Sequence, residues 1–100
     1  MREGRKLMSN IQQIFRVQMM LANDATQDYD TFYSNFEKDS QYSAAKREFF
    51  IEYMGNEWWV DTFSNHLCCV TEFNSFGAAQ EAEQEGYELL SSYGYWKEEE

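Results

Sequence analysis

The sequence has few of the residues that build metal sites or catalytic nucleophiles. It contains one histidine, His66, and two adjacent cysteines, Cys68 and Cys69. Neighbouring side chains on a strand point to opposite faces, so the two cysteines are poorly placed to form a disulfide with each other. No further histidine or cysteine pair could complete the four ligands of a structural zinc site. We expect no metal, no cofactor and free thiols, which suit a reducing cytosol.

Motifs of common enzymes are also absent. The sequence has no glycine-rich phosphate loop, no Ser/His/Asp motif spacing and no group that would orient His66 as a base for a cysteine nucleophile. Carboxylate pairs are abundant, as expected with eighteen acidic residues, and without a predicted pocket they are weak evidence for acid–base catalysis. We expect that the protein is not an enzyme.

Long apolar runs are missing as well. No run reaches the roughly 18 to 20 residues that a membrane span needs. The first residues lack the apolar core of a signal peptide. We expect no membrane partner and a cytoplasmic location, which would be the host cytoplasm if a phage encodes the protein.

Basic residues are scarce, since eight lysines and arginines face eighteen acidic residues and the formal net charge is −10. The charge is uneven: residues 1–23 sum to +3, residues 24–70 to −6 and residues 71–100 to −7. Such a surface repels nucleic acid and anionic membranes, because phosphates are neutralised by lysine and arginine. We therefore expect no direct nucleic-acid binding and predict a basic protein partner.

What the chain has in quantity is aromatic residues, eighteen in one hundred. They supply large apolar side chains for a core, so the acidity does not indicate disorder. The length predicts one domain over residues 1–100, with flexible ends at 1–7 and 96–100.

Helical spacing of apolar residues predicts two helices in the N-terminal half. The first covers residues 9–21, with Ser9 as its N-cap and an apolar arc that includes Ile11, Ile14 and Val17. The second covers residues 26–37, where aromatic residues recur at intervals of three and four.

Turn residues predict three antiparallel strands near 48–53, 57–63 and 66–72, with turns at Gly55-Asn56 and Ser64-Asn65. A continuous helix over residues 40–54 is the alternative. Apolar spacing predicts a last helix over residues 76–90 that begins after Ser75, and its internal Gly86 indicates close packing on the sheet. The expected fold is α+β, with N-terminal helices, a three-stranded meander and a C-terminal helix on the sheet, in the order α-α-β-β-β-α.

Alternation predicts two apolar sheet faces. One face, which includes Trp58, carries Phe49, Ile51, Tyr53, Trp58, Val60, Leu67, Cys69 and Phe73. The other carries Phe50, Met54, Trp59, Phe63, Cys68 and Val70, with Glu52, Asp61 and Glu72 among them. The C-terminal helix can cover one face only, so either the N-terminal helices or another chain covers the second. We expect the N-terminal helices to do so.

The candidate partner-binding residues form two groups. Glu81, Glu85 and Glu88 lie within a narrow arc of the last predicted helix, opposite its alanines. Glu85 and Glu88 follow Glu81 at roughly 6 and 10.5 Å along the helix axis. They either present negative charge to a partner or form a solvated face. Trp59, Asp61 and Phe63 lie on the second sheet face, where the two aromatic side chains are interface anchors if they are exposed and core residues if a helix covers them.

The order of helix, three strands and helix over about residues 47–91 resembles the double-stranded-RNA-binding domain, and its strands and last helix also resemble small DNA-binding domains of integrase type. In the RNA-binding family the last helix opens with lysines that grip phosphates. Here the matching stretch, AAQEAEQEG, carries Glu81, Glu83 and Glu85. The charge is reversed, so no binding residue is carried over.

The leading hypothesis is an interaction module that inhibits a nucleic-acid-binding protein. Small size, acidity and dense aromatics are similar to those of phage counter-defence proteins that mimic DNA, such as anti-CRISPR and anti-restriction proteins. The alternatives are a structural or regulatory subunit or homodimer that uses the second sheet face, and a ligand-binding or catalytic domain with a pocket lined by Trp59 and Tyr53.

Overall fold

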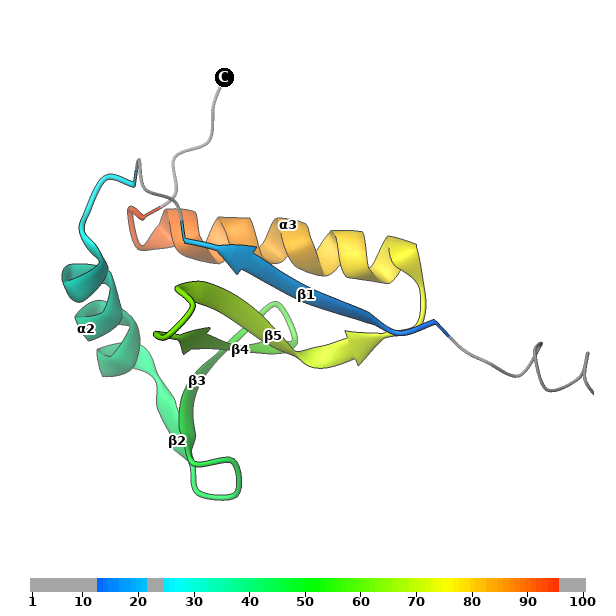
Figure 1. The fold of residues 1–100 in the computed structure, drawn as a ribbon, viewed down its shortest axis with the longest axis horizontal. Coiled ribbons are helices and arrows are strands. Elements are labelled where there is room, and N and C mark those ends of the chain that lie inside the picture. Colours follow the sequence, from blue (N-terminus) through cyan, green and yellow to red (C-terminus); the bar gives the residue numbers. More distant parts are fainter. Residues whose placement is uncertain (1–12, 22–24, 96–100) are drawn as a thin grey trace, which may run out of the picture.

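The computed structural model describes residues 13–21 and 25–95, which form a five-stranded antiparallel sheet and two helices (Figure 1). The elements in chain order are β1 (Phe15–Met20), α2 (Tyr29–Asp39), β2 (Gln41–Ser43), β3 (Glu48–Tyr53), β4 (Asn56–Asp61), β5 (His66–Phe73) and α3 (Phe76–Ser92). The strand order across the sheet is β1-β5-β4-β3-β2. The α+β class is confirmed, whereas the predicted order α-α-β-β-β-α is wrong in its first element and lacks one strand.

The predicted first helix is wrong over residues 15–20, which form β1. This strand pairs with β5, with Met19 opposite Leu67 and Met20 opposite His66. Val17 and Met19 are buried while Met20 is 65% exposed, which is the period of two of a strand with one covered face. So short an apolar segment fits both the helical period of 3.6 residues and the strand period of two. It forms a strand because it can pair with the free edge of β5. The proposed N-cap, Ser9, lies outside the described residues.

The second helix is confirmed as α2. Asp28 caps it, because its carboxylate accepts a hydrogen bond from the backbone N–H of Thr31 at 2.7 Å. Phe32 and Phe36, one turn apart, are buried. The helix ends at Asp39 and β2 follows directly, so the alternative of a helix over residues 40–54 is wrong.

The two predicted hairpin turns are present with small shifts. Between β3 and β4 the positive φ angles fall on Met54 (54°) and Gly55 (86°), as in a two-residue hairpin loop, one residue earlier than predicted. Met54 therefore lies in a turn and not on a sheet face. β4 ends at Asp61, whose carboxylate accepts hydrogen bonds from the backbone N–H groups of Phe63 at 3.0 Å and Ser64 at 3.4 Å. Phe63 thus also lies in a turn, which corrects its predicted place on a strand.

For the predicted face residues that lie in strands, the register confirms the division of the sheet into two faces. Ile51, Trp58 and Cys69 lie opposite one another across three strands, and this inner face is the one that α3 covers. At the crossing of helix and sheet, a Cβ atom on Gly86 would lie 2.6 Å from Met19 Cε and 2.8 Å from Trp58 Cη2. The close packing predicted for Gly86 is therefore confirmed.

The end of α3 ties the two helices together. Ser75 caps its start, as predicted, by accepting a hydrogen bond from the Ala78 N–H at 3.1 Å. At its end Gly94 has a φ of 71° and the Tyr95 N–H bonds to the Leu90 carbonyl at 3.0 Å, which is a Schellman motif. This motif directs Tyr95 into the core, where its ring centroid lies 4.6 Å from that of Phe32.

The outer face, on which Trp59 lies opposite Cys68 and Cys68 opposite Gln18, is not the face that α3 covers; α2 lies at its edge, where it contacts β3 and lines a groove with Trp59. The expected cover by N-terminal helices is wrong for the described part of the chain. Residues 15–20 form an edge strand, and α2 packs against Tyr93 and Tyr95 at the end of α3 (Figure 1).

Candidate partner-binding surface

The acidic row, which consists of Glu81, Glu85 and Glu88, lies along α3 beside the β3–β4 hairpin. Glu85 Oε1 accepts a hydrogen bond from Asn56 Nδ2 at 2.9 Å, and Glu88 Oε1 accepts one from the Tyr53 hydroxyl at 3.3 Å. Glu81 is exposed. The hairpin therefore positions two of the three carboxylates.

No cation of the described residues is paired with the acidic row. The ion pairs within residues 13–21 and 25–95 join Arg16 to Glu72 at 2.7 Å and Lys46 to Glu57 at 3.7 Å. The α3 sequence itself contains four glutamates and no basic residue. Burial, followed by the charge of Glu88, raises the pKa of Tyr53, so this hydroxyl remains a hydrogen-bond donor to the row.

The acidic row opposes the stability of its own helix. Glu81 and Glu85 are like charges four residues apart, which costs about 0.2–0.5 kcal/mol in an isolated helix. Glu88 lies near the C-terminal end of α3, where the helix dipole is negative and favours cations instead. The described fold does not need this arrangement for packing, since the buried side of α3 is made of other residues, namely Ala79, Ala82, Gly86, Leu89 and Leu90.

The second predicted group, Trp59, Asp61 and Phe63, lines one groove of about 410 Å³. Trp59 is half-buried and Phe63 is fully exposed, at 101%. The structure thus brings these three residues together, but at the end of β4 and in the turn after it. Nothing in the described contacts joins this group to the acidic row.

Asp61 is held in its ionised form. Hydrogen bonds from Ser64, and then from the backbone N–H of Phe63, lower the pKa of its carboxyl below the ordinary value. The groove therefore carries a negative charge at the end of β4 at neutral pH.

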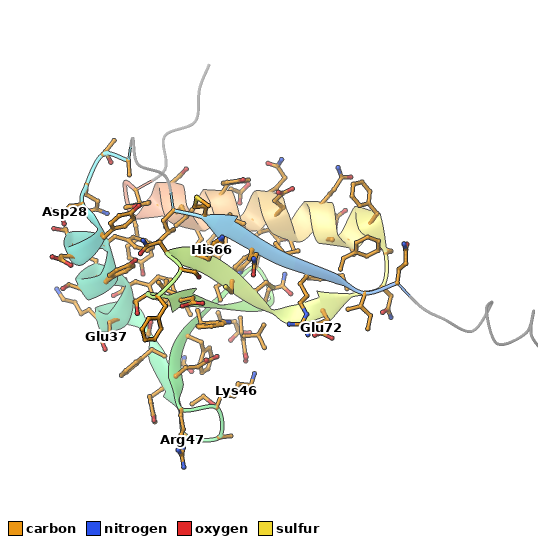
Figure 2. The ribbon with its side chains drawn as sticks, viewed as in Figure 1. Asp28, Glu37, Lys46, Arg47, His66 and Glu72 are labelled. Atoms are coloured by element: carbon orange, nitrogen blue, oxygen red, sulfur yellow. The ribbon has the colours of Figure 1, made fainter. Side chains whose placement is uncertain are left out.

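Sequence reasoning missed the other side of the groove. It is formed by α2 and the start of β3, and the residues concerned are Tyr33, Phe36, Glu37, Arg47, Glu48 and Phe49. Figure 2 shows Glu37 on α2 and Arg47 at the tip of the β2–β3 hairpin, with the Arg47 side chain directed away from the rest of the protein. No motif marks these residues, because they meet only where β3 leaves the sheet.

The cysteine thiols of the described residues are not activated as nucleophiles, because burial raises the pKa of both. Cys68 and Cys69 are free thiols on opposite sheet faces, and burial raises the pKa of Cys68 to about 11, so its thiol is protonated at neutral pH. Within residues 13–21 and 25–95 no three His, Cys, Asp or Glu side chains are grouped as metal ligands would be. Trp59 lines the groove without Tyr53, which bonds to Glu88 instead.

Comparison with protein-family models, curated proteins and solved structures found no significant match to this chain. Among the described residues neither helix has the length and apolar character required to cross a membrane.

Proposed function

We propose that this protein is a small acidic protein–protein interaction module that inhibits its target by occupying a basic, nucleic-acid-binding surface. In this proposal it acts as DNA mimics of the phage counter-defence type do, such as anti-CRISPR or anti-restriction proteins. The observation that carries the proposal is the acidic row, whose carboxylates have no paired cation among the described residues. Two of them are held in place by Tyr53 and Asn56.

The chemistry of the row matches lysine and arginine clusters of a target. Carboxylates that are already ordered lose little conformational freedom on binding, which favours affinity. The remaining negative charge of the protein, −10 overall, accelerates encounter with a basic surface at low salt.

The test compares two variants with the same charge change. E81Q/E85Q/E88Q removes the acidic row and keeps an oxygen acceptor for Tyr53 and Asn56, whereas D30N/E52Q/E83Q removes three charges elsewhere. Each protein is used to capture partners from native cytosol at about 0.05 M and 0.5 M salt. The captured partner is then assayed for binding to DNA and RNA in the presence of each variant.

We expect a partner whose binding to the protein weakens as salt rises. Wild type and D30N/E52Q/E83Q should block its nucleic-acid binding, whereas E81Q/E85Q/E88Q should not. Replacement of Glu81, Glu85 and Glu88 by lysine would weaken binding further. Equal inhibition by the row variant and by wild type would remove the basis for mimicry.

A homodimer or an obligate subunit is the second candidate function. The observation that favours it is the outer face, which α3 does not cover and on which Trp59 is half-buried and Met20 is 65% exposed. Light scattering separates the two functions: a dimer that persists at high salt and dissociates in Trp59→Ala would favour the second.

A further inference from the structure

The sheet splits between β3 and β4. β3 pairs with β4 only from Ile51, opposite Trp58, to Tyr53, opposite Asn56, whereas Glu48–Phe50 pair with β2. Figure 1 shows β2 and β3 turning away from β4 together. Residues 59–61 of β4 therefore have β5 on one side and no strand of the described residues on the other.

The groove of about 410 Å³ lies at this split. Its volume falls within the range of about 300–1,000 Å³ that ligand sites occupy. Phe49 and Phe63 line it and are both exposed, at 41% and 101%. Exposed aromatic side chains around a hollow are typical of a binding surface.

The open edge of β4 allows the groove to bind a peptide through backbone hydrogen bonds. A strand directs its backbone N–H and C=O groups alternately to its two sides, so residues 59–61 present part of theirs to the groove. An extended peptide can bind to such an edge as an added strand, with alternate side chains entering the groove.

The charge of the groove selects a basic peptide. Glu37, Glu48 and Asp61 line it, and none of the three forms an ion pair with the described residues. Arg47 is the one basic residue of the lining, and its side chain extends away from the protein (Figure 2). Three carboxylates against this one cation favour lysine and arginine over acidic side chains.

We propose that this groove binds an extended, basic segment of a partner protein as an additional strand beside residues 59–61. Apolar side chains of the segment pack against Phe49 and Phe63, and its basic side chains face Glu37 and Glu48. The inference rests on the proposed basic partner, but it concerns a surface separate from the acidic row.

The test is an NMR titration of the full chain, labelled with ¹⁵N, against three capped pentapeptides. The first is Arg-Val-Arg-Val-Arg, and the second replaces each arginine by glutamate. The third has the sequence of the first, with N-methyl groups on the backbone amides of one edge that prevent strand pairing there. The first peptide is expected to shift the amide signals of residues 59–61 and to slow their hydrogen exchange. The other two peptides are expected to bind more weakly.

Two variant pairs locate the site. E37Q/E48Q is expected to weaken binding of the arginine peptide by about fivefold or more, since each exposed ion pair contributes up to about that factor, while E52Q/E83Q leaves it unchanged. Phe63→Ala is expected to weaken binding, whereas Ile14→Ala, which removes another exposed apolar side chain outside the groove, is not.

Equal binding of the N-methylated or the glutamate peptide would overturn the inference. So would shifts confined to residues 81–88 and lost in E81Q/E85Q/E88Q, a result that leaves the proposed function standing. Shifts at residues 59–61 that follow protein concentration without peptide would make a second copy the occupant and would overturn it as well. Loss of inhibition in the row variant with unchanged groove binding supports both proposals separately.

Discussion

Trp58 and Trp59 are neighbours in the chain and differ in environment. Trp58 is fully buried on the inner face, in contact with the α3 backbone at Gly86, while Trp59 is half-buried on the outer face and lines the groove. Alternation along the strand places the two residues on different faces, but it does not indicate which face a helix covers. Their difference shows that the packing of α3 on one face buries Trp58 and leaves Trp59 able to line the groove.

The largest expected effect is at Trp58. Trp58→Ala should lower the free energy of unfolding by about 3–5 kcal/mol, because it leaves a cavity under α3. Trp58→Phe should cost less, since the indole N–H of Trp58 has no hydrogen-bond acceptor among the described residues and its removal relieves a desolvation cost. Urea unfolding measures both changes. A cost for Trp58→Ala no larger than that of an exposed residue would contradict the inner face as the core.

Gly86 tests the packing of α3 on the inner face from the side of the helix. Gly86→Ala should destabilise the protein by about 1–2 kcal/mol despite the better helix propensity of alanine, because its Cβ would meet the rigid ring of Trp58 at 2.8 Å. The matched control is Gly77→Ala in the first turn of α3, where a Cβ has no neighbour within 4 Å. Thermal unfolding should show a lower midpoint for the first variant and an equal or higher one for the second.

On the outer face, Trp59→Ala should lower the free energy of unfolding by about 1–2 kcal/mol, below the Trp58 value, because Trp59 is partly exposed whereas Trp58 is fully buried. Its main effect should be on partner binding or on dimerisation. Equal destabilisation by Trp58→Ala and Trp59→Ala in the same urea series would mean that the outer face is covered as fully as the inner one.

The smallest expected effect is a pH dependence at Asp61. Its pKa is lower in the folded chain than the ordinary value of 3.8, so its contribution to stability is complete above 3.8 and is lost as the pH falls through the lower folded value. Asp61→Asn retains an oxygen acceptor for the turn and should flatten this acid limb. The comparison is the stability of wild type and variant from pH 5 to the acid limit. An unchanged slope would show that the turn does not stabilise the ionised form.

Local patterns in the sequence were sufficient for much of the fold. Aromatic spacing predicted α2, Ser75 marked the start of α3, and alternation assigned Trp58 and Trp59 to different faces. The segment containing β1 could not be assigned in this way. Its strand is selected by pairing with β5, some fifty residues later, and not by its own apolar pattern.

The candidate partner-binding surface was likewise predictable from the sequence only in part. Helical geometry alone predicted that Glu81, Glu85 and Glu88 share one side of a helix. The bonds from Tyr53 and Asn56 that hold two of these carboxylates depend on the β3–β4 hairpin and could not be predicted from spacing. The groove depends on the departure of β3 from β4, which leaves no mark in the residues that line it.

By itself the sequence determined the acidity, the helical stretches and the alternation of the strands, since these follow from residue type and from the 3.6- and two-residue periods. Tertiary structure alone decided that residues 15–20 join the sheet, which of the two faces α3 covers and that β4 keeps an open edge. These outcomes depend on contacts between residues far apart in the chain, and no local pattern encodes such contacts.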